Sequence, residues 1–236
     1  MEKMKNYLSW SEKMVYWSRV IKMVDKKVIL AVGAHPDDIE WGCGGTLKLH
    51  KNAGNEVYAL VLTDGECNQD QRVIESKEAG EILGLDEVFF PHLPIDELSD
   101  NRANIYLIEE YIKKIDPQII YTTPKNDRHQ DHRYCALATL SAARKVPNIF
   151  IYETGSNILF TPHMYVDISE TMNEKIDALS KHKTQIDRGS IQLSDVYALA
   201  KYRASQLSKI NKTLEYAEAF EIYRILSYPK TGGMEI

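Results

Sequence analysis

Residues 28–38, VILAVGAHPDD, join an apolar run to a cluster of polar side chains directly behind it. The apolar part, residues 28–32, has the length and composition of a buried strand. The same pattern recurs further along the chain, where the apolar run IIYTT at residues 119–123 precedes HQDH at residues 129–132. Because open α/β folds keep their sites at the carboxyl ends of the strands, we expect the two polar clusters to meet at one edge of a sheet.

Strand-like and helix-like segments alternate from residue 27 onward. The predicted strands cover residues 28–32, 57–63, 87–90, 119–123 and 148–152, and the predicted helices lie near residues 45–52, 71–83, 105–115 and 134–144. This βαβα alternation predicts an α/β fold, with a Rossmann-like, mostly parallel sheet and helices on both faces.

The pattern changes after about residue 155. Residues 165–168 resemble a short strand, a helix from Ser169 or Glu170 runs through His182, another helix covers about 196–208, and a last strand covers 220–226. The sequence contains no linker rich in Pro, Gly or Ser, no internal repeat and no low-complexity tract. We therefore expect a single domain over residues 1–236. Its C-terminal third adds helices and short strands to the same core, and residues 1–26 form an N-terminal helical extension.

The composition limits the classes of partner. A chain of 236 residues with 44% hydrophobic content can bury a full core, and a net charge of −5 without a basic stripe argues against nucleic acid. The longest apolar runs are of strand length, which predicts no membrane span. Three cysteines without a CxxC pair indicate a reducing, cytoplasmic setting. Apolar residues in the N-terminal segment leave a homo-oligomer open.

The first polar cluster, residues 34–38, offers metal ligands and a base within one turn. Pro36 stiffens the turn, and the adjacent Asp37 and Asp38 point in different directions in an extended or turn conformation. One carboxylate can then bind a divalent metal together with His35, while the other faces the water on that metal. The alternative interpretation is a helix N-cap aspartate preceded by a turn proline, which is a common arrangement.

Residues 42–46, GCGGT, follow this cluster and bear on two further interpretations. They lack the GxGxxG spacing of a dinucleotide-binding turn, which disfavours a nucleotide-binding protein. We interpret the glycines as allowing close packing of a helix on the sheet. Cys43 is interpreted as a small buried side chain rather than a metal ligand.

The second polar cluster, residues 129–132, carries His129 and His132 three positions apart, which the start of a helix would place on one side. Both could bind the metal, or one could bind it while the other takes part in the reaction. Asp131 between them could orient an imidazole, as carboxylates do for ligating histidines. The alternative is a polar loop, residues 125–133, that only caps the helix beginning near Tyr134.

With both clusters in view, the chain resembles the LmbE/PIG-L family of metal-dependent N-acetylglucosaminyl deacetylases. The family's opening motif stands here as AHPDDIEWGCGGT at residues 34–46, and its H-x-D-H motif as residues 129–132. Further matches are TDGE at 63–66, Arg72 with Glu75, LPID at 93–96, KHKTQ at 181–185 and AEAF at 217–220. The resemblance spans roughly residues 27–226.

This resemblance implies a metal centre with a base beside it. His35, Asp38 and His132 would hold a zinc ion, with other divalent metals such as Fe²⁺ also compatible with these ligands. Such a set leaves positions for water and a substrate carbonyl. Asp37 would act as the general base.

The resemblance also implies roles around that centre. His129 would act as an imidazolium that stabilises the oxyanion or protonates the leaving amine, and Asp131 would orient it. Arg72 and Asp96 would contact sugar hydroxyls. His182 is expected to pack between helices rather than take part in the reaction.

The implied function is a hydrolase that removes the N-acetyl group from a small molecule, an N-acetylated amino sugar or its conjugate, through water activated by Asp37. A metal-dependent amidase acting on a non-sugar N-acyl compound would use the same chemistry. A non-catalytic sugar-binding protein is a third reading, against which the presence of Asp37 argues. The residues that lie at or just beyond predicted strand ends and could set specificity are Glu66, Arg72, His92, Asp96 and Glu153.

Overall fold

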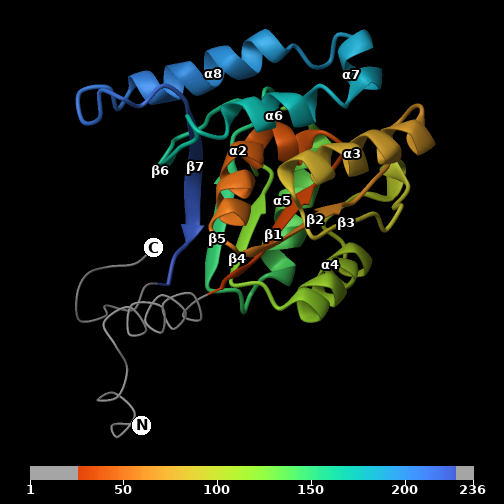
Figure 1. The fold of residues 1–236 in the computed structure, drawn as a ribbon. Helices are drawn as coiled ribbons and strands as arrows, with labels where there is room; N and C mark the ends of the chain where they lie inside the picture. Colours follow the sequence, from red (N-terminus) through yellow and green to blue (C-terminus); the bar gives the residue numbers. More distant parts are fainter. Residues whose placement is uncertain (1–25, 227–236) are drawn as a thin grey trace, which may run out of the picture.

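The computed structural model describes residues 26–226 (Figure 1), and the predicted helical extension at residues 1–26 lies outside this range except for Lys26. The described residues form a seven-stranded sheet with the order β3-β2-β1-β4-β5-β7-β6. The strands are β1 (Val28–Gly33), β2 (Glu56–Val61), β3 (Glu87–Phe89), β4 (Ile119–Thr122), β5 (Asn148–Tyr152), β6 (Met164–Asp167) and β7 (Ala217–Arg224). Each corresponds to a predicted strand, with small shifts at the ends.

β1 lies in the middle of the sheet and pairs in parallel with both β2 and β4. β3 and β5 continue the parallel arrangement outward, and β7 pairs antiparallel with β5 and β6. The strand order therefore reverses between β1 and β4. Loops that leave the carboxyl ends of two such strands part to opposite faces and open a crevice between them. The predicted Rossmann-like, mostly parallel sheet is confirmed.

Helices cover both faces of this sheet, as predicted. They are α2 (Asp38–Asn52), α3 (Gln69–Leu83), α4 (Arg102–Ile115), α5 (Gln130–Ala142), α6 (Met172–Leu179), α7 (Lys183–Asp187), α8 (Leu193–Ser205) and the 3₁₀ turn η2 (Ile95–Glu97). Leu30 of β1 belongs to a core shared with α4 and α5, whereas its neighbour Ile29 belongs to the core under α2. Within residues 26–226, no helix combines the length and the apolar character that crossing a membrane requires.

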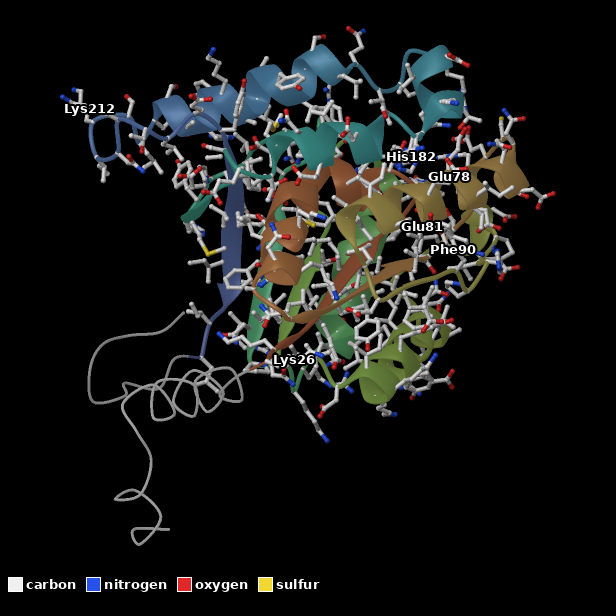
Figure 2. All side chains as sticks on the ribbon, viewed as in Figure 1. Lys26, Glu78, Glu81, Phe90, His182 and Lys212 are labelled. Atoms are coloured by element: carbon white, nitrogen blue, oxygen red, sulfur yellow. The ribbon has the colours of Figure 1, made fainter. Side chains whose placement is uncertain are left out.

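The C-terminal third adds a further layer. Figure 1 shows α6 lying between α8 and the pair α2 and α3. The predicted helix through His182 is divided, because α6 ends at Leu179 and α7 begins at Lys183. His182 lies in this break (Figure 2) and is fully buried, with Nε2 3.5 Å from Glu40 Oε1. A packing role fits this position.

The start of α2 differs from expectation. The helix begins at Asp38 instead of near Gly45, although glycine lowers helix propensity. Close packing explains the difference, since a Cβ on Gly42 would lie 2.1 Å from the Tyr152 ring and one on Gly45 would lie 2.9 Å from Ile168. The glycines therefore let α2 approach the sheet, as predicted. Cys43 is fully buried between them.

Candidate metal and catalytic site

The two polar clusters meet where the strand order reverses. β1 ends at Gly33, and the first polar cluster leads from there into α2. β4 ends at Thr122, and the second polar cluster forms the start of α5. The ring centroids of His35 and His132 are 5.5 Å apart. The expected meeting of the clusters is confirmed.

His35, Asp38 and His132 form a group that can hold one metal ion. Each offers a ligand atom within 4.8 Å of the other two, and all three residues are buried. Asp38 Oδ1 lies 3.1 Å from His132 Nε2, and Asp38 Oδ2 lies 3.6 Å from His35 Nδ1. Three protein ligands of this kind leave coordination positions free, which is the arrangement of catalytic zinc sites.

The field around the two histidines favours positive charge. Burial lowers the pKa of His132, but Asp38 and Asp127 outweigh burial and raise the pKa to about 10. For His35, hydrogen bonds with Asp131 and Asp38 likewise outweigh burial and raise the pKa to about 9. The carboxylates near these imidazoles make the site attractive to a cation. With two imidazoles and a carboxylate as donors, it fits a divalent transition metal.

Asp127 supports the candidate metal site, and the sequence analysis does not identify it. Its Oδ2 lies 3.0 Å from His132 Nδ1 and accepts a hydrogen bond from Thr154 Oγ1. Its Oδ1 accepts a hydrogen bond from the His129 backbone N–H at 2.8 Å. Asp127 is fully buried and orients His132 so that Nε2 faces the other ligands. The sequence signal for this role is slight, a carboxylate in the polar loop before the HQDH motif.

Asp131 does not take the expected position. Its Oδ2 lies 3.0 Å from His35 Nε2 but 3.8 Å from His129 Nδ1. The carboxylate therefore lies within hydrogen-bond distance of His35, whereas the expected partner was His129. The start of α5 explains this correction, because the first turn of the helix directs the Asp131 side chain across to the loop after β1.

His129 is held by a backbone group instead. The Asp131 backbone N–H donates to His129 Nδ1 at 3.3 Å, which describes a neutral ring with its proton on Nε2. Burial, followed by the neighbouring charges of His35 and His132, lowers the pKa of His129. The imidazolium role of His129 stays a prediction. His129 lines the cavity over the metal group.

Asp37 faces the same cavity from the N-cap position of α2. Its φ of 109° is rare outside glycine, and strain of this kind clusters at functional sites. Asp38 Oδ2 accepts hydrogen bonds from the backbone N–H groups of Ala34 and His35, both at 2.9 Å. Asp37 Oδ2 instead lies 3.6 Å from Arg72 Nη2. The two carboxylates point apart, as predicted.

The simple N-cap interpretation of Asp37 does not hold, because within residues 26–226 its side chain makes no capping hydrogen bond. Burial and the neighbouring Asp38 carboxylate raise the pKa of Asp37 to about 6. The Asp37 carboxylate therefore keeps more basicity than the Asp38 carboxylate beside it.

The two predicted sugar-binding residues lie in different surroundings. Arg72 lines the cavity and donates from Nη2 to the Pro36 carbonyl oxygen at 2.8 Å. Its guanidinium fills the space beside Gly65, where a Cβ would lie 1.8 Å from Nη1. Asp96 is exposed in η2. Its neighbour Ile95 lines the cavity, but Asp96 is not among the described residues of that lining.

The cavity has a volume of about 720 Å³, within the range of small-molecule sites. Among the described residues considered for specificity, Glu66 and Glu153 line it and His92 does not. His92 Nδ1 instead lies 2.7 Å from Asp64 Oδ2. Glu153 is neutralised by Arg203, whose Nε donates to Glu153 Oε2 at 2.8 Å.

Comparison with known proteins shows similarity to deacetylases. The family described as PIG-L, GlcNAc-PI de-N-acetylase, matches residues 30–143. The Escherichia coli K12 protein YaiS, described as an uncharacterised deacetylase, is 37% identical over 175 residues, which cover 67% of this chain and 92% of YaiS. A diacetylchitobiose deacetylase of Thermococcus kodakarensis is 27% identical over 201 residues, covering 73% of this chain and 75% of that enzyme.

The fold also matches an enzyme with another activity. The structure of 4-carboxy-2-hydroxymuconate hydratase from Pseudomonas putida KT2440 superimposes with a TM-score of 0.74 at 20% identity, covering 88% of this chain and 98% of that one. This likeness concerns the fold alone. The reaction must therefore be argued from the site and the deacetylase relatives.

Proposed function

The chain belongs to the PIG-L (LmbE) family of deacetylases, and on that basis we propose that it is a zinc-dependent hydrolase that removes the N-acetyl group from an N-acetylated amino sugar or its conjugate. One observation carries the proposal: His35, Asp38 and His132 converge at the floor of a cavity that Asp37 also faces. A ligand group with a free carboxylate beside it has the parts that hydrolysis of an amide requires.

His35, Asp38 and His132 would hold the metal. When bound there, a divalent ion would act as a Lewis acid and lower the pKa of a coordinated water to about 7. Zinc is proposed because it accepts this mixed imidazole and carboxylate set, and Fe²⁺ is the alternative.

Asp37 would carry the proton through the reaction. It takes one proton from the attacking water as the new C–O bond forms at the acetamide carbonyl. It then gives that proton to the sugar nitrogen as the C–N bond breaks, which leaves a free amine and acetic acid, and the acid releases its remaining proton to solvent to give acetate. Its contact with Arg72 holds the carboxylate at the cavity wall.

His129 would stabilise the negative charge that develops on the carbonyl oxygen. The hydrogen bond from the Asp131 backbone to Nδ1 leaves Nε2–H as the group free to donate. A preorganised donor at this point acts mainly on the transition state. Arg72 and Asp96 are proposed to contact the hydroxyls of the sugar.

The remaining parts of the proposal concern setting and assembly. Cys43, Cys67 and Cys135 are all free thiols, which supports a cytoplasmic location. A small-molecule substrate fits the size of the cavity. The single-domain organisation and a homo-oligomer stay predictions.

The test is metal analysis of protein purified without chelator, combined with acetate release from a panel of substrates. The panel contains N-acetylglucosamine, N,N′-diacetylchitobiose and N-acyl amino acids. We expect about one zinc per chain and acetate release from the amino sugars, lost in Asp37→Asn. Release from the N-acyl amino acids alone would establish the amidase. Sugar binding without any release would establish a binding protein.

A further inference from the structure

We propose that the Asp131 carboxylate is a positioning group for the metal ligand His35, and that it makes Nδ1 the nitrogen through which His35 binds the ion. This inference rests on the proposed metal centre and refines it. It gives Asp131 a role in metal binding. The position of Asp131 beside His129 in the HQDH motif would instead suggest a role in proton transfer through His129.

The two imidazole ligands are held in opposite orientations. His35 turns Nε2 toward Asp131, at 3.0 Å, and Nδ1 toward Asp38, at 3.6 Å. His132 turns Nδ1 toward Asp127, at 3.0 Å, and Nε2 toward Asp38, at 3.1 Å. In each ring one nitrogen is engaged by an outer carboxylate and the other faces Asp38.

Such outer carboxylates fix both the orientation and the tautomer of a metal-bound histidine. Asp131 would thereby hold the proton of His35 on Nε2, and Asp127 would hold that of His132 on Nδ1. The two side chains have little contact with water, since the Asp131 side chain is 6% exposed and that of His35 is 9% exposed. Their hydrogen bond is accordingly protected from competition with solvent.

Asp131 contacts His35 and His129 through different groups. Its side chain contacts His35, whereas its backbone N–H contacts His129. An alanine at this position removes the first contact and keeps the second. The substitution Asp131→Ala therefore tests the carboxylate without releasing His129.

The first experiment measures zinc affinity by competition between the apoprotein and a fluorescent chelator. We expect Asp131→Ala to raise the Kd for zinc about 10- to 100-fold. His129→Ala should change it by about twofold or less, and Asp131→Ala should have the same effect in the His129→Ala background. An unchanged Kd in Asp131→Ala, or an effect that disappears in the double variant, would overturn the inference.

Asp195→Ala is the matched control. Like Asp131, Asp195 lies in the first turn of a helix, and it lines the cavity. Among the described residues, however, it forms no hydrogen bond with His35, Asp38 or His132. Its removal should leave the Kd for zinc unchanged. If Asp131→Ala does not fold, Asp131→Asn keeps an oxygen that can accept from His35 Nε2–H and should give an intermediate Kd.

The second experiment identifies the bound nitrogens. Protein labelled with ¹⁵N-histidine and loaded with ¹¹³Cd²⁺ should show cadmium coupling to Nδ1 of His35 and to Nε2 of His132. Coupling to Nε2 of His35 would contradict the inference. Neither experiment needs turnover. If the chain binds zinc in this way but releases no acetate, the proposed function is wrong and the inference about Asp131 still holds. A wild-type chain without tight zinc binding would overturn the inference.

Discussion

At the scale of single residues, Asp37 and Asp38 differ because the backbone turns between them. Asp38 receives two backbone hydrogen bonds and lies against His132. Burial raises the pKa of Asp38, but His132 and His35 outweigh it and hold the pKa well below its usual value. The positive φ at Asp37 turns the second carboxylate away from these partners. Identical side chains thus become a candidate ligand and a candidate base.

The role of Asp37 leads to the first prediction. Asp37→Ala should retain its zinc and lower kcat by about 10²- to 10⁴-fold, because general base catalysis contributes about that factor. Metal content per chain and kcat are measured on the same preparation. Turnover close to that of the wild type would remove Asp37 from the base role.

His129 leads to the second prediction. His129→Ala should lower kcat by about 10²- to 10³-fold, the loss typical of a missing oxyanion donor, with the metal retained. His129→Gln, which keeps an N–H donor, should recover part of the rate. Metal content that falls as sharply as activity would instead show that His129 is a ligand.

At the scale of elements, α2 connects the fold to the site. Its first residue is the candidate ligand Asp38, and its Gly42 packs against Tyr152 of β5. Its last turn is held to β4, because His50 Nε2 lies 2.9 Å from the Tyr121 hydroxyl. The position of the metal ligand therefore depends on packing along the whole helix.

Gly42→Ala tests this packing. The new Cβ would lie 2.1 Å from the Tyr152 ring, and overpacking of this kind costs about 1–3 kcal/mol. We expect a lower free energy of unfolding and weaker zinc binding. Gly44→Ala is the control, because its Cβ would meet Lys175 Cγ at an ordinary 3.5 Å. Equal effects of the two substitutions in urea unfolding would argue against close packing as the cause.

His50 gives α2 a pH-dependent stability. Burial, followed by the charge of Lys27, lowers the pKa of His50 from 6.5 to about 4. As the pH falls from about 6.5 to about 4, His50 becomes protonated in the unfolded chain but stays neutral in the folded chain. Stability should therefore fall across this window, by roughly 3 kcal/mol from this group. His50→Gln should lose that part of the pH dependence in urea unfolding at pH 7 and pH 4.5. The same pH dependence in both proteins would rule out His50 as its source.

At the scale of the whole molecule, a buried ion pair joins the C-terminal third to the site. Lys175 of α6 and Glu218 of β7 pair at 2% and 5% exposure. Glu218 also accepts hydrogen bonds from the backbone N–H groups of Gly45 and Thr46 in α2, at 3.0 and 2.8 Å. Lys175 in turn donates to the Trp41 carbonyl oxygen. Three elements far apart in sequence meet at these charges.

Breaking this pair should destabilise the entire fold. Lys175→Met leaves Glu218 buried without its counter-charge, which costs about 3–5 kcal/mol. The double variant Lys175→Met with Glu218→Gln should recover part of the loss. Urea unfolding measures both. A change below about 1 kcal/mol for the single variant would mean that the pair does not hold the C-terminal third in place.

The sequence by itself determined the sheet, its parallel core and the meeting of residues 34–38 with residues 129–132. These features follow from local patterns, because an apolar run of strand length and the loop behind it are read directly from neighbouring residues. It also separated Asp37 from Asp38, since adjacent side chains in a turn diverge. The single helix expected after residue 169 was wrong, because α6 ends at Leu179 and the non-helical backbone of His182 precedes a separate helix, α7.

Only the tertiary structure decided which carboxylate contacts which imidazole. Asp127 reaches His132 and Asp131 reaches His35 through space, and the second contact crosses from α5 to the loop after β1. In the sequence Asp131 stands beside His129, but the direction of the first turn of α5 takes its side chain elsewhere. A hydrogen bond depends on distance and angle within about an ångström, and sequence spacing does not specify position that finely.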